Sequence, residues 1–324
     1  MHTGSTVING PHQGALIDTV SGDEWFIHFQ DRGLYGRICH LQPVTWKDGW
    51  PVIGVNPDEK NVGEPVFNME KPDVGAIDDN FDDYGLSASD DFKDGKLNLN
   101  WQWLGNHYDS FCGPISDKQN GIRLYALNIS GEKDPIIWKS ANVLTQKLIY
   151  PMFDMKIKMD ASGLNEGDRA GVCMTGGQYM AAYIEKNGES SFSVKVVNSI
   201  GGDADKKEEV ESSFELEPIC NDKGISLSDA LKDITWNMEF SHDNSELNSE
   251  DMYFQNVHEP LGGKNPSLKV RISFAGSDYI DLGVDYTPSD HTWVGAKTGI
   301  FALSQNKASA SGHADFLSVK CCEK

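Results

Sequence analysis

The sequence has no long apolar run, a shortage of basic residues and no pair of cysteines in Cys-X-X-Cys spacing. No segment approaches the roughly 18 consecutive apolar residues that a membrane-spanning helix needs. Lys and Arg number 28 against 49 Asp and Glu, and the resulting formal charge of −21 repels nucleic-acid phosphates and anionic lipid heads. We therefore expect neither nucleic acid nor a membrane surface as a partner, and neutral ligands and cations remain open.

The N-terminal residues argue against a signal peptide, and the cysteines argue against a zinc or redox motif. Residues 1–15 lack the charged start and the apolar run of a signal peptide, so we expect nothing in this sequence to export the chain. The 6 cysteines have no Cys-X-X-Cys spacing, which weakens zinc-motif and redox-motif interpretations. We expect most of them to be buried apolar thiols, and their pairing and the oligomeric state stay open.

Apolar and aromatic residues are plentiful. They include 8 Trp and 14 Phe within an apolar fraction of 39%, enough for the core of one large β domain or two ordinary ones. Short β-type runs occupy residues 15–18, 25–30, 37–41 and 44–46, and turn residues such as Ser21-Gly22-Asp23 and Lys47-Asp48-Gly49 separate them. This small meander fits one propeller blade, since blades run roughly 40–50 residues in the repeat families.

The rest of the chain predicts a second β domain. Prolines and glycines crowd the segment after residue 50. We expect a partial propeller blade over residues 1–56, a linker over 57–84 and a sandwich over 85–324. Alternating patterns at 153–159 and 268–274, and the Asn187-Gly188 turn between two further strands, favour a two-sheet jelly roll. The predicted fold class is all-β, with 227–234 as the one helical candidate.

Several short stretches also share a pattern with one enzyme family. They are Gly10–Gly14, Trp25–Arg37, His40–Pro43, Asp48–Gly54, Gly63–Val66, Lys71–Pro72, Leu99, Trp101–Trp103, Asn106, Leu144–Lys147, Gly295–Phe301 and Ala314–Phe316. With these residues the chain resembles glycoside hydrolase family 43, the β-xylosidase and α-L-arabinofuranosidase group, and specifically its C-terminal part. The resemblance implies the last blade of a five-bladed β-propeller followed by a concanavalin A-like sandwich.

The resemblance also implies a function. Family members invert configuration, with one carboxylic acid protonating the leaving oxygen and one carboxylate activating water, held roughly 6.5–9.5 Å apart. These carboxylates and a third, modulating acid come from earlier blades, and nothing in residues 1–75 matches them. We therefore expect no catalytic residues here, no glycosidase activity from this chain alone, and a parent enzyme that is bacterial and periplasmic or secreted. The expected partners are plant cell-wall oligosaccharides of xylose or arabinose, and the sequence does not decide between the two sugars.

Four residues are the candidates for sugar binding. In the family, the histidine matching His12 lies near the propeller axis, close to the sugar and to a bound calcium, and Gln13 accompanies it. The arginine matching Arg37 points toward the sugar hydroxyls, a role that suits its five-donor fork. A loop aromatic of the sandwich forms a sugar wall, and Trp293 matches it. The alternatives are a loop histidine, a surface arginine and a core tryptophan.

A structural calcium ion is the expected cofactor, with no organic cofactor. Asp91 opens the sandwich and Asp315 lies in its last strand, and the first and last strands of jelly rolls often meet. The alternative is a pair of surface acids. A single blade has unpaired sheet edges, so we also expect self-association through them or local disorder. The rival function is a non-catalytic carbohydrate-binding or architectural module.

Overall fold

The computed structural model describes residues 8, 12–56, 62–66, 68–75, 88–116, 118–242, 266–291, 293–306 and 312–324. The chain forms two compact units. The first takes in the described residues up to 75 and the short segment His291–Gly295, and the second takes in the remainder. Most of the expected linker, 57–84, lies outside the described residues, so the predicted domain boundaries stay a prediction. No helix in the described part of the chain is long and apolar enough to span a bilayer.

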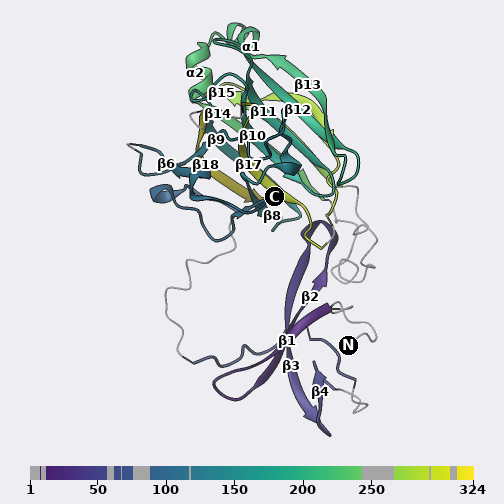
Figure 1. The fold of residues 1–324 in the computed structure, drawn as a ribbon. Helices are drawn as coiled ribbons and strands as arrows, with labels where there is room; N and C mark the ends of the chain where they lie inside the picture. Colours follow the sequence, from purple (N-terminus) through teal and green to yellow (C-terminus); the bar gives the residue numbers. More distant parts are fainter. Residues whose placement is uncertain are drawn as a thin grey trace. The chain divides into compact units, whose positions relative to one another are not determined.

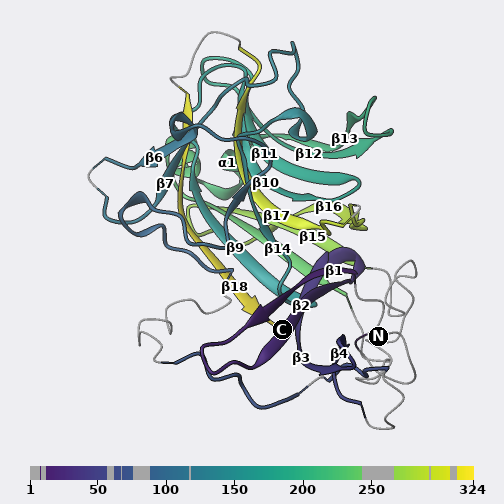
Figure 2. The ribbon, with the colours of Figure 1, turned by 60° about the horizontal axis from the view of Figure 1, so that its bottom comes forward.

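The described residues of the first unit form a four-stranded antiparallel meander (Figure 2). Its elements are β1 (His12–Asp18), β2 (Glu24–Asp31), the 3-10 turn η1 (Gly33–Tyr35), β3 (Arg37–Lys47) and β4 (Trp50–Ile53). The strands follow one another in chain order across the sheet, as in a propeller blade. Gly22, Gly36 and Gly49 have positive φ at the three turns, which explains why glycine stands there.

Strand β3 corrects one detail of the prediction. The sequence predicted two strands, 37–41 and 44–46, but β3 runs unbroken from Arg37 to Lys47 and includes Pro43. Pro43 is the last residue of β3 that pairs with β2, and Val44 is the first that pairs with β4. Proline is tolerated here because the strand changes partners at this point and one missing N–H costs little.

The second unit is a sandwich of two sheets, each with seven strands among the described residues (Figure 1). The β10 sheet has the order β13-β12-β11-β10-β17-β8-β5, and the β14 sheet has the order β16-β15-β14-β9-β18-β7-β6. The bounds of the strands are β5 Gln102–Trp103, β6 Cys112–Pro114, β7 Ile122–Tyr125, β8 Val143–Lys147, β9 Met152–Asp160, β10 Asp168–Thr175, β11 Tyr179–Lys186, β12 Phe192–Ile200, β13 Lys207–Glu215, β14 Ile234–Ser241, β15 Ser267–Phe274, β16 Ile280–Tyr286, β17 Lys297–Ser304 and β18 His313–Glu323. The predicted all-β fold class with a jelly-roll sandwich is confirmed.

Local signals account for several of these strands. The alternating runs predicted at 153–159 and 268–274 are β9 and β15, which both pair with β14. The Asn187-Gly188 signal lies in the turn between β11 and β12, where the Asn187 N–H donates to the Ser191 carbonyl at 2.8 Å. Period-two patterning and turn chemistry therefore predict the elements of this unit well.

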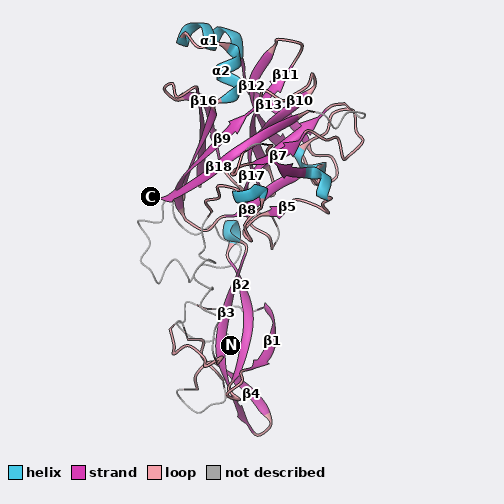
Figure 3. Ribbon diagram, turned by 90° about the vertical axis from the view of Figure 1, so that its left-hand side faces the viewer, coloured by secondary structure: helices cyan, strands magenta, loops and turns pink. Residues whose placement is uncertain are grey.

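Two short helices lie together at one end of the sandwich (Figure 3). Helix α2 (Leu227–Lys232) matches the predicted helical segment, but α1 (Leu216–Lys223) corrects the expectation of a single helix. Pro218 in the first turn and the left-handed Gly224 at the C-terminus are the signals that mark α1. Ser226 caps α2 by accepting the Asp229 N–H at 3.1 Å.

The central strands β10 and β11 are buried on both faces of their sheet. One face carries a cluster that includes Cys173, Tyr179, Tyr183 and Phe301, packed against Ile137 of the 3-10 turn η5 (Ile137–Lys139). The intervening residues of β10 and β11 point to the opposite face and are buried as well. All six cysteines are free thiols, and only Cys173 and Cys220 are buried, so the expectation that most would be buried is wrong.

Candidate functional site

Arg37 is placed by the tight connection between β2 and β3. It begins β3, directly after η1 and Gly36, and it lies opposite Asp31 in the β2–β3 register. The Gly36 N–H donates to the Gly33 carbonyl at 2.9 Å, and Gly36 accepts from the Arg32 N–H at 2.8 Å. These bonds fix the backbone from which the Arg37 side chain projects.

The Arg37 guanidinium lies against two aromatic rings of its own unit. Its Cζ is 4.1 Å from the centre of the Phe29 ring and 5.1 Å from the centre of the Trp293 ring. Both distances are within the range of cation–π attraction. The Nε of Arg37 has no hydrogen-bond partner among the described residues. The structure thus brings together two of the predicted sugar-binding residues, Arg37 and Trp293, and adds Phe29, which the sequence did not single out.

Two glycines allow the Trp293 segment to lie against η1. A Cβ on Gly36 would be 2.5 Å from the Val294 carbonyl oxygen, and one on Gly295 would be 2.4 Å from the Gly36 nitrogen. Both glycines also have positive φ, at 68° and 77°. Backbone approach this close excludes any side chain, so these positions require glycine.

Trp293 is an exposed residue with a strained backbone. Its side chain is 62% exposed, which excludes the alternative of a core tryptophan. Its φ is +69°, in the left-handed region that a bulky side chain rarely adopts and that costs roughly 1–3 kcal/mol. Strain and an exposed aromatic ring together are typical of residues that contact ligands.

The meander carries a histidine pair that was not among the predicted site residues, although both histidines lie in the stretches that resemble the family. His28 on β2 lies opposite His40 on β3, with ring centres 5.4 Å apart. Burial lowers the pKa of His28, while the Phe29 carbonyl partly offsets this effect. Burial, followed by the charges of His28 and Arg32, lowers the pKa of His40 to about 4. Burial therefore favours the neutral form of both rings, and neither Nε2 has a hydrogen-bond partner in the described part of the chain.

His12 and Gln13 lie at the start of β1. His12 pairs with Phe29 in register, and a bulge follows it where Gln13 has a φ of +40°. Gln13 is exposed, whereas the side chain of His12 lies outside the described structure. The roles predicted for these two residues stay predictions.

The acids of the meander stabilise turns and the sheet. Asp31 accepts the Gly33 N–H at 3.2 Å, Asp23 accepts from the Ser21 hydroxyl at 2.8 Å, and Glu24 accepts from the indole of Trp46. Their partners all lie within the meander, so each of these three carboxylates has a structural explanation.

The two acids predicted to bind calcium in the sandwich have different surroundings. Both carboxylate oxygens of Asp315 are occupied by Arg123, whose Nε and Nη2 donate at 2.7 and 2.9 Å. Asp91 is exposed, and it is the neighbouring Asp90 that pairs with the last strand through Val319. No group of three His, Cys, Asp or Glu converges on a metal position within the described ranges. The geometry around Asp315 therefore favours an ion pair over a calcium ligand, and calcium binding stays a prediction.

Comparison with known proteins places this architecture in a family. The model of the beta xylosidase C-terminal concanavalin A-like domain matches residues 89–320, which is the sandwich described above. The chain belongs to this family. Its concanavalin A-like domain accounts for the second unit, and the sequence resemblance to glycoside hydrolase family 43 is confirmed.

Curated relatives of this concanavalin A-like protein are named as beta-xylosidases. A beta-xylosidase homologue from Xylanibacter ruminicola is 38% identical over 165 residues, which make up 50% of this chain and 29% of that protein. The beta-xylosidase of Formosa agariphila is 25% identical over 327 residues, 94% of this chain and 46% of that enzyme. Among solved structures, a bifunctional GH43-CE protein of Bacteroides eggerthii has a TM-score of 0.65 at 25% identity, covering 97% of this chain and 34% of that one. The chain thus spans less than half the length of each of these relatives and resembles their C-terminal part.

Proposed function

We propose that this chain is the C-terminal part of a family 43 glycoside hydrolase acting on oligosaccharides derived from xylan or arabinoxylan. The observation that carries the proposal is the pairing of Arg37 and Trp293, at 5.1 Å, in a chain whose relatives are xylosidases. An exposed indole suits the apolar C–H face of a pyranose, and a guanidinium fork suits adjacent sugar hydroxyls. In this proposal the first unit is a propeller blade that forms one wall of the sugar site.

The proposal assigns no catalytic acid or base to this chain. Inverting hydrolysis needs two carboxylates roughly 6.5–9.5 Å apart, one protonated and one ionised. Asp23, Glu24 and Asp31 are held in turns and sheet contacts instead. The Arg37–Trp293 wall would bind and orient the sugar while other carboxylates perform the chemistry.

Binding and turnover assays on the purified chain test this function. We expect xylotriose to bind without hydrolysis, and aryl β-xyloside and aryl α-L-arabinofuranoside to remain intact. Trp293→Ala should weaken xylotriose binding about tenfold, since aromatic stacking contributes about 0.5–1.5 kcal/mol beyond the area it buries and about 1.4 kcal/mol corresponds to tenfold. Trp50→Ala is the matched control, because Trp50 is a 76% exposed tryptophan of the same meander.

Each contrary result has a clear meaning. Hydrolysis by the purified chain would overturn the assignment of catalysis to other carboxylates. Equal binding by the Trp293 and Trp50 variants would overturn the sugar wall. A chain that neither binds nor hydrolyses any of these sugars would favour an architectural module.

Self-association through the meander is the second part of the proposal. Strands β1 and β4 are at the two ends of the strand order and leave edge groups available for pairing. The apolar side chains of Ile17, Ile27 and Leu41 are 42%, 40% and 36% exposed. We expect the sedimentation coefficient to rise with protein concentration, and a strictly monomeric chain would contradict this part.

A further inference from the structure

A row of charged side chains lies on one face of the β10 sheet. Arg169 on β10 is opposite Glu185 on β11, and Tyr183 on β11 is opposite Lys195 on β12. Because side chains alternate along strands, these residues all project from the same face. Arg169 and Glu185 are only 7% and 6% exposed, so the charges are held within the protein.

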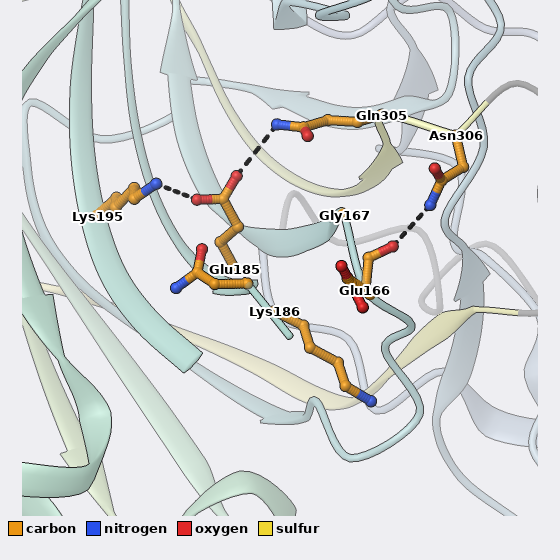
Figure 4. A pocket seen from close by; sticks show the side chains of 8 residues that line it. Glu166, Gly167, Glu185, Lys186, Lys195, Gln305 and Asn306 are labelled. Atoms are coloured by element: carbon orange, nitrogen blue, oxygen red, sulfur yellow. Dashed lines mark hydrogen bonds and ion pairs between the residues drawn. The ribbon is translucent and has the colours of Figure 1, made fainter. Parts of the chain in front are cut away.

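Polar contacts join these residues to neighbouring strands. Glu185 forms an ion pair with Lys195 and accepts from the Gln305 side-chain amide at 3.4 Å, and Figure 4 shows this chain of three residues. Arg169 donates to Glu208 at 2.8 Å and to the Tyr183 hydroxyl at 3.2 Å. Burial raises the pKa of Tyr183 to about 12, against the opposing effect of the Arg169 charge, so its hydroxyl stays protonated.

Two cavities open at this row of charges. One has a volume of about 540 Å³ and extends toward Arg169 and Glu208. The other has a volume of about 600 Å³ and extends toward Lys186 and Asn306. Both are lined by Glu185, Lys195 and Gln305, which form their common wall. Figure 4 shows these three residues at the second cavity. Each volume is within the range of roughly 300–1,000 Å³ in which small-molecule sites fall.

The lining charges indicate what kind of ligand fits. Each cavity has as many basic as acidic side chains, in a chain whose net charge is −21. An anion site needs an excess of basic groups and a cation site an excess of acidic ones, and neither cavity has such an excess. Alternating donors and acceptors match a neutral molecule with many hydroxyl groups.

The row retains hydrogen-bonding capacity for such a ligand. The ammonium group of Lys195 has three N–H donors. Among the described contacts, it donates only to Glu185. The buried Nε of Arg169 has no partner among the described residues. Stability gives a weak explanation for the row, because buried ion pairs often contribute less than apolar residues of the same volume.

We propose that Lys195, Glu185 and Gln305 form a second sugar site, on the sandwich, that binds a neutral oligosaccharide. The two cavities hold successive sugar units, and the shared wall supplies donors and acceptors to hydroxyl groups at their junction. The choice of xylose-based ligands rests on the proposed function, whereas the cavities and their charge balance do not. This site is separate from the residues of the Arg37–Trp293 wall.

Calorimetry with xylohexaose tests the site directly. The test variant combines Lys195→Met with Glu185→Gln, so that no single buried charge is left without its partner. We expect its affinity to fall about tenfold or more, as for losing hydrogen bonds to charged groups. The matched control combines Arg271→Met with Glu239→Gln, which removes an ion pair of 2.9 Å on the β14 sheet and should leave the affinity unchanged.

A milder variant covers the case in which the test variant fails to fold. Gln305 is exposed, so Gln305→Ala should fold normally and still weaken binding several-fold. Hydrogen exchange with xylohexaose should protect β11 and β12. The proposal would be overturned if xylohexaose does not bind or if both variants leave its binding unchanged. A preference for oligogalacturonate over xylohexaose would overturn it as well.

Comparison with Trp293→Ala separates this inference from the proposed function. If Trp293→Ala alone abolishes binding, the sandwich site is wrong and the sugar wall stands. If the Lys195 and Glu185 variant alone abolishes it, the sandwich site stands and the sugar wall is wrong.

Discussion

Arg37 and Trp293 stack within one compact unit, with the guanidinium 5.1 Å from the ring centre, although Arg37 begins β3 and Trp293 precedes β17. The contact places a permanent charge and an apolar ring at one point of the meander. It depends on two glycines whose backbones touch, and it is the structural basis of the proposed sugar wall.

Substitution of either glycine should disrupt this contact. Gly36→Ala and Gly295→Ala each combine positive φ with a Cβ within 2.5 Å of backbone, so each should destabilise the local packing by about 2–4 kcal/mol. Gly33→Ala is the control, because its φ is +56° but nothing lies within 4 Å of the new Cβ, and it should cost about 1 kcal/mol. Hydrogen exchange of residues 33–37 and 293–295 measures the loss. Equal effects of the three variants would show that the close approach is not required.

The stability of the meander should fall in mild acid. His40 has a pKa of about 4 in the folded chain against 6.5 unfolded, so the unfolded chain binds the proton more readily. The full stability is present above pH 6.5, where His40 is neutral in both states. It is partly lost as the pH falls from 6.5 to about 4, because the unfolded chain then takes up a proton that the folded chain does not. After allowance for solvent screening we expect a loss of about 1–2 kcal/mol. Urea titrations of wild type and His40→Gln measure it, and the variant should show a flatter pH dependence. The exposed His107, in the sandwich, is the control position for substitution.

Asp90 should contribute strongly to sandwich stability. Its carboxylate accepts from the Phe92 N–H at 2.8 Å, the Asn98 N–H at 3.1 Å and the Trp101 indole at 2.8 Å. Asp90→Ala leaves these donors without an acceptor and should lower the free energy of unfolding by about 2–4 kcal/mol. Asp91→Ala, at an exposed neighbouring position, should change it by less than about 0.5 kcal/mol. Thermal unfolding compares the two, and a larger effect at Asp91 would contradict this assignment.

Calcium binding can be tested without knowledge of the site. An ion that binds only the folded chain stabilises it, by about 2.7 kcal/mol when the ion concentration is a hundred times its dissociation constant. The melting temperature rises as a result. Calcium should therefore raise the melting temperature relative to EDTA if the ion predicted near His12, Asp91 and Asp315 is bound. Asp315→Asn should abolish that difference only if calcium displaces Arg123 from this carboxylate. Identical melting curves with calcium and with EDTA would count against the ion.

The local elements were predictable because their causes are local. Alternation made β9 and β15 recognisable, and Asn187-Gly188 marked the hairpin between β11 and β12. Helix α1 was missed because it has little amphipathic character, although Pro218 and Gly224 mark its ends. The two face-to-face sheets followed from many short alternating runs with few helical signals.

By itself, the sequence determined the strands, the turns, the family and the candidate status of Arg37 and Trp293. Only the tertiary structure decided that these two side chains meet, that Asp90 rather than Asp91 faces the last strand, and that Arg169, Glu185 and Lys195 form one row. The physical reason is the distance along the chain over which each interaction acts. Backbone preferences act over a few residues, whereas contacts between distant strands depend on register and on how closely two backbones can approach.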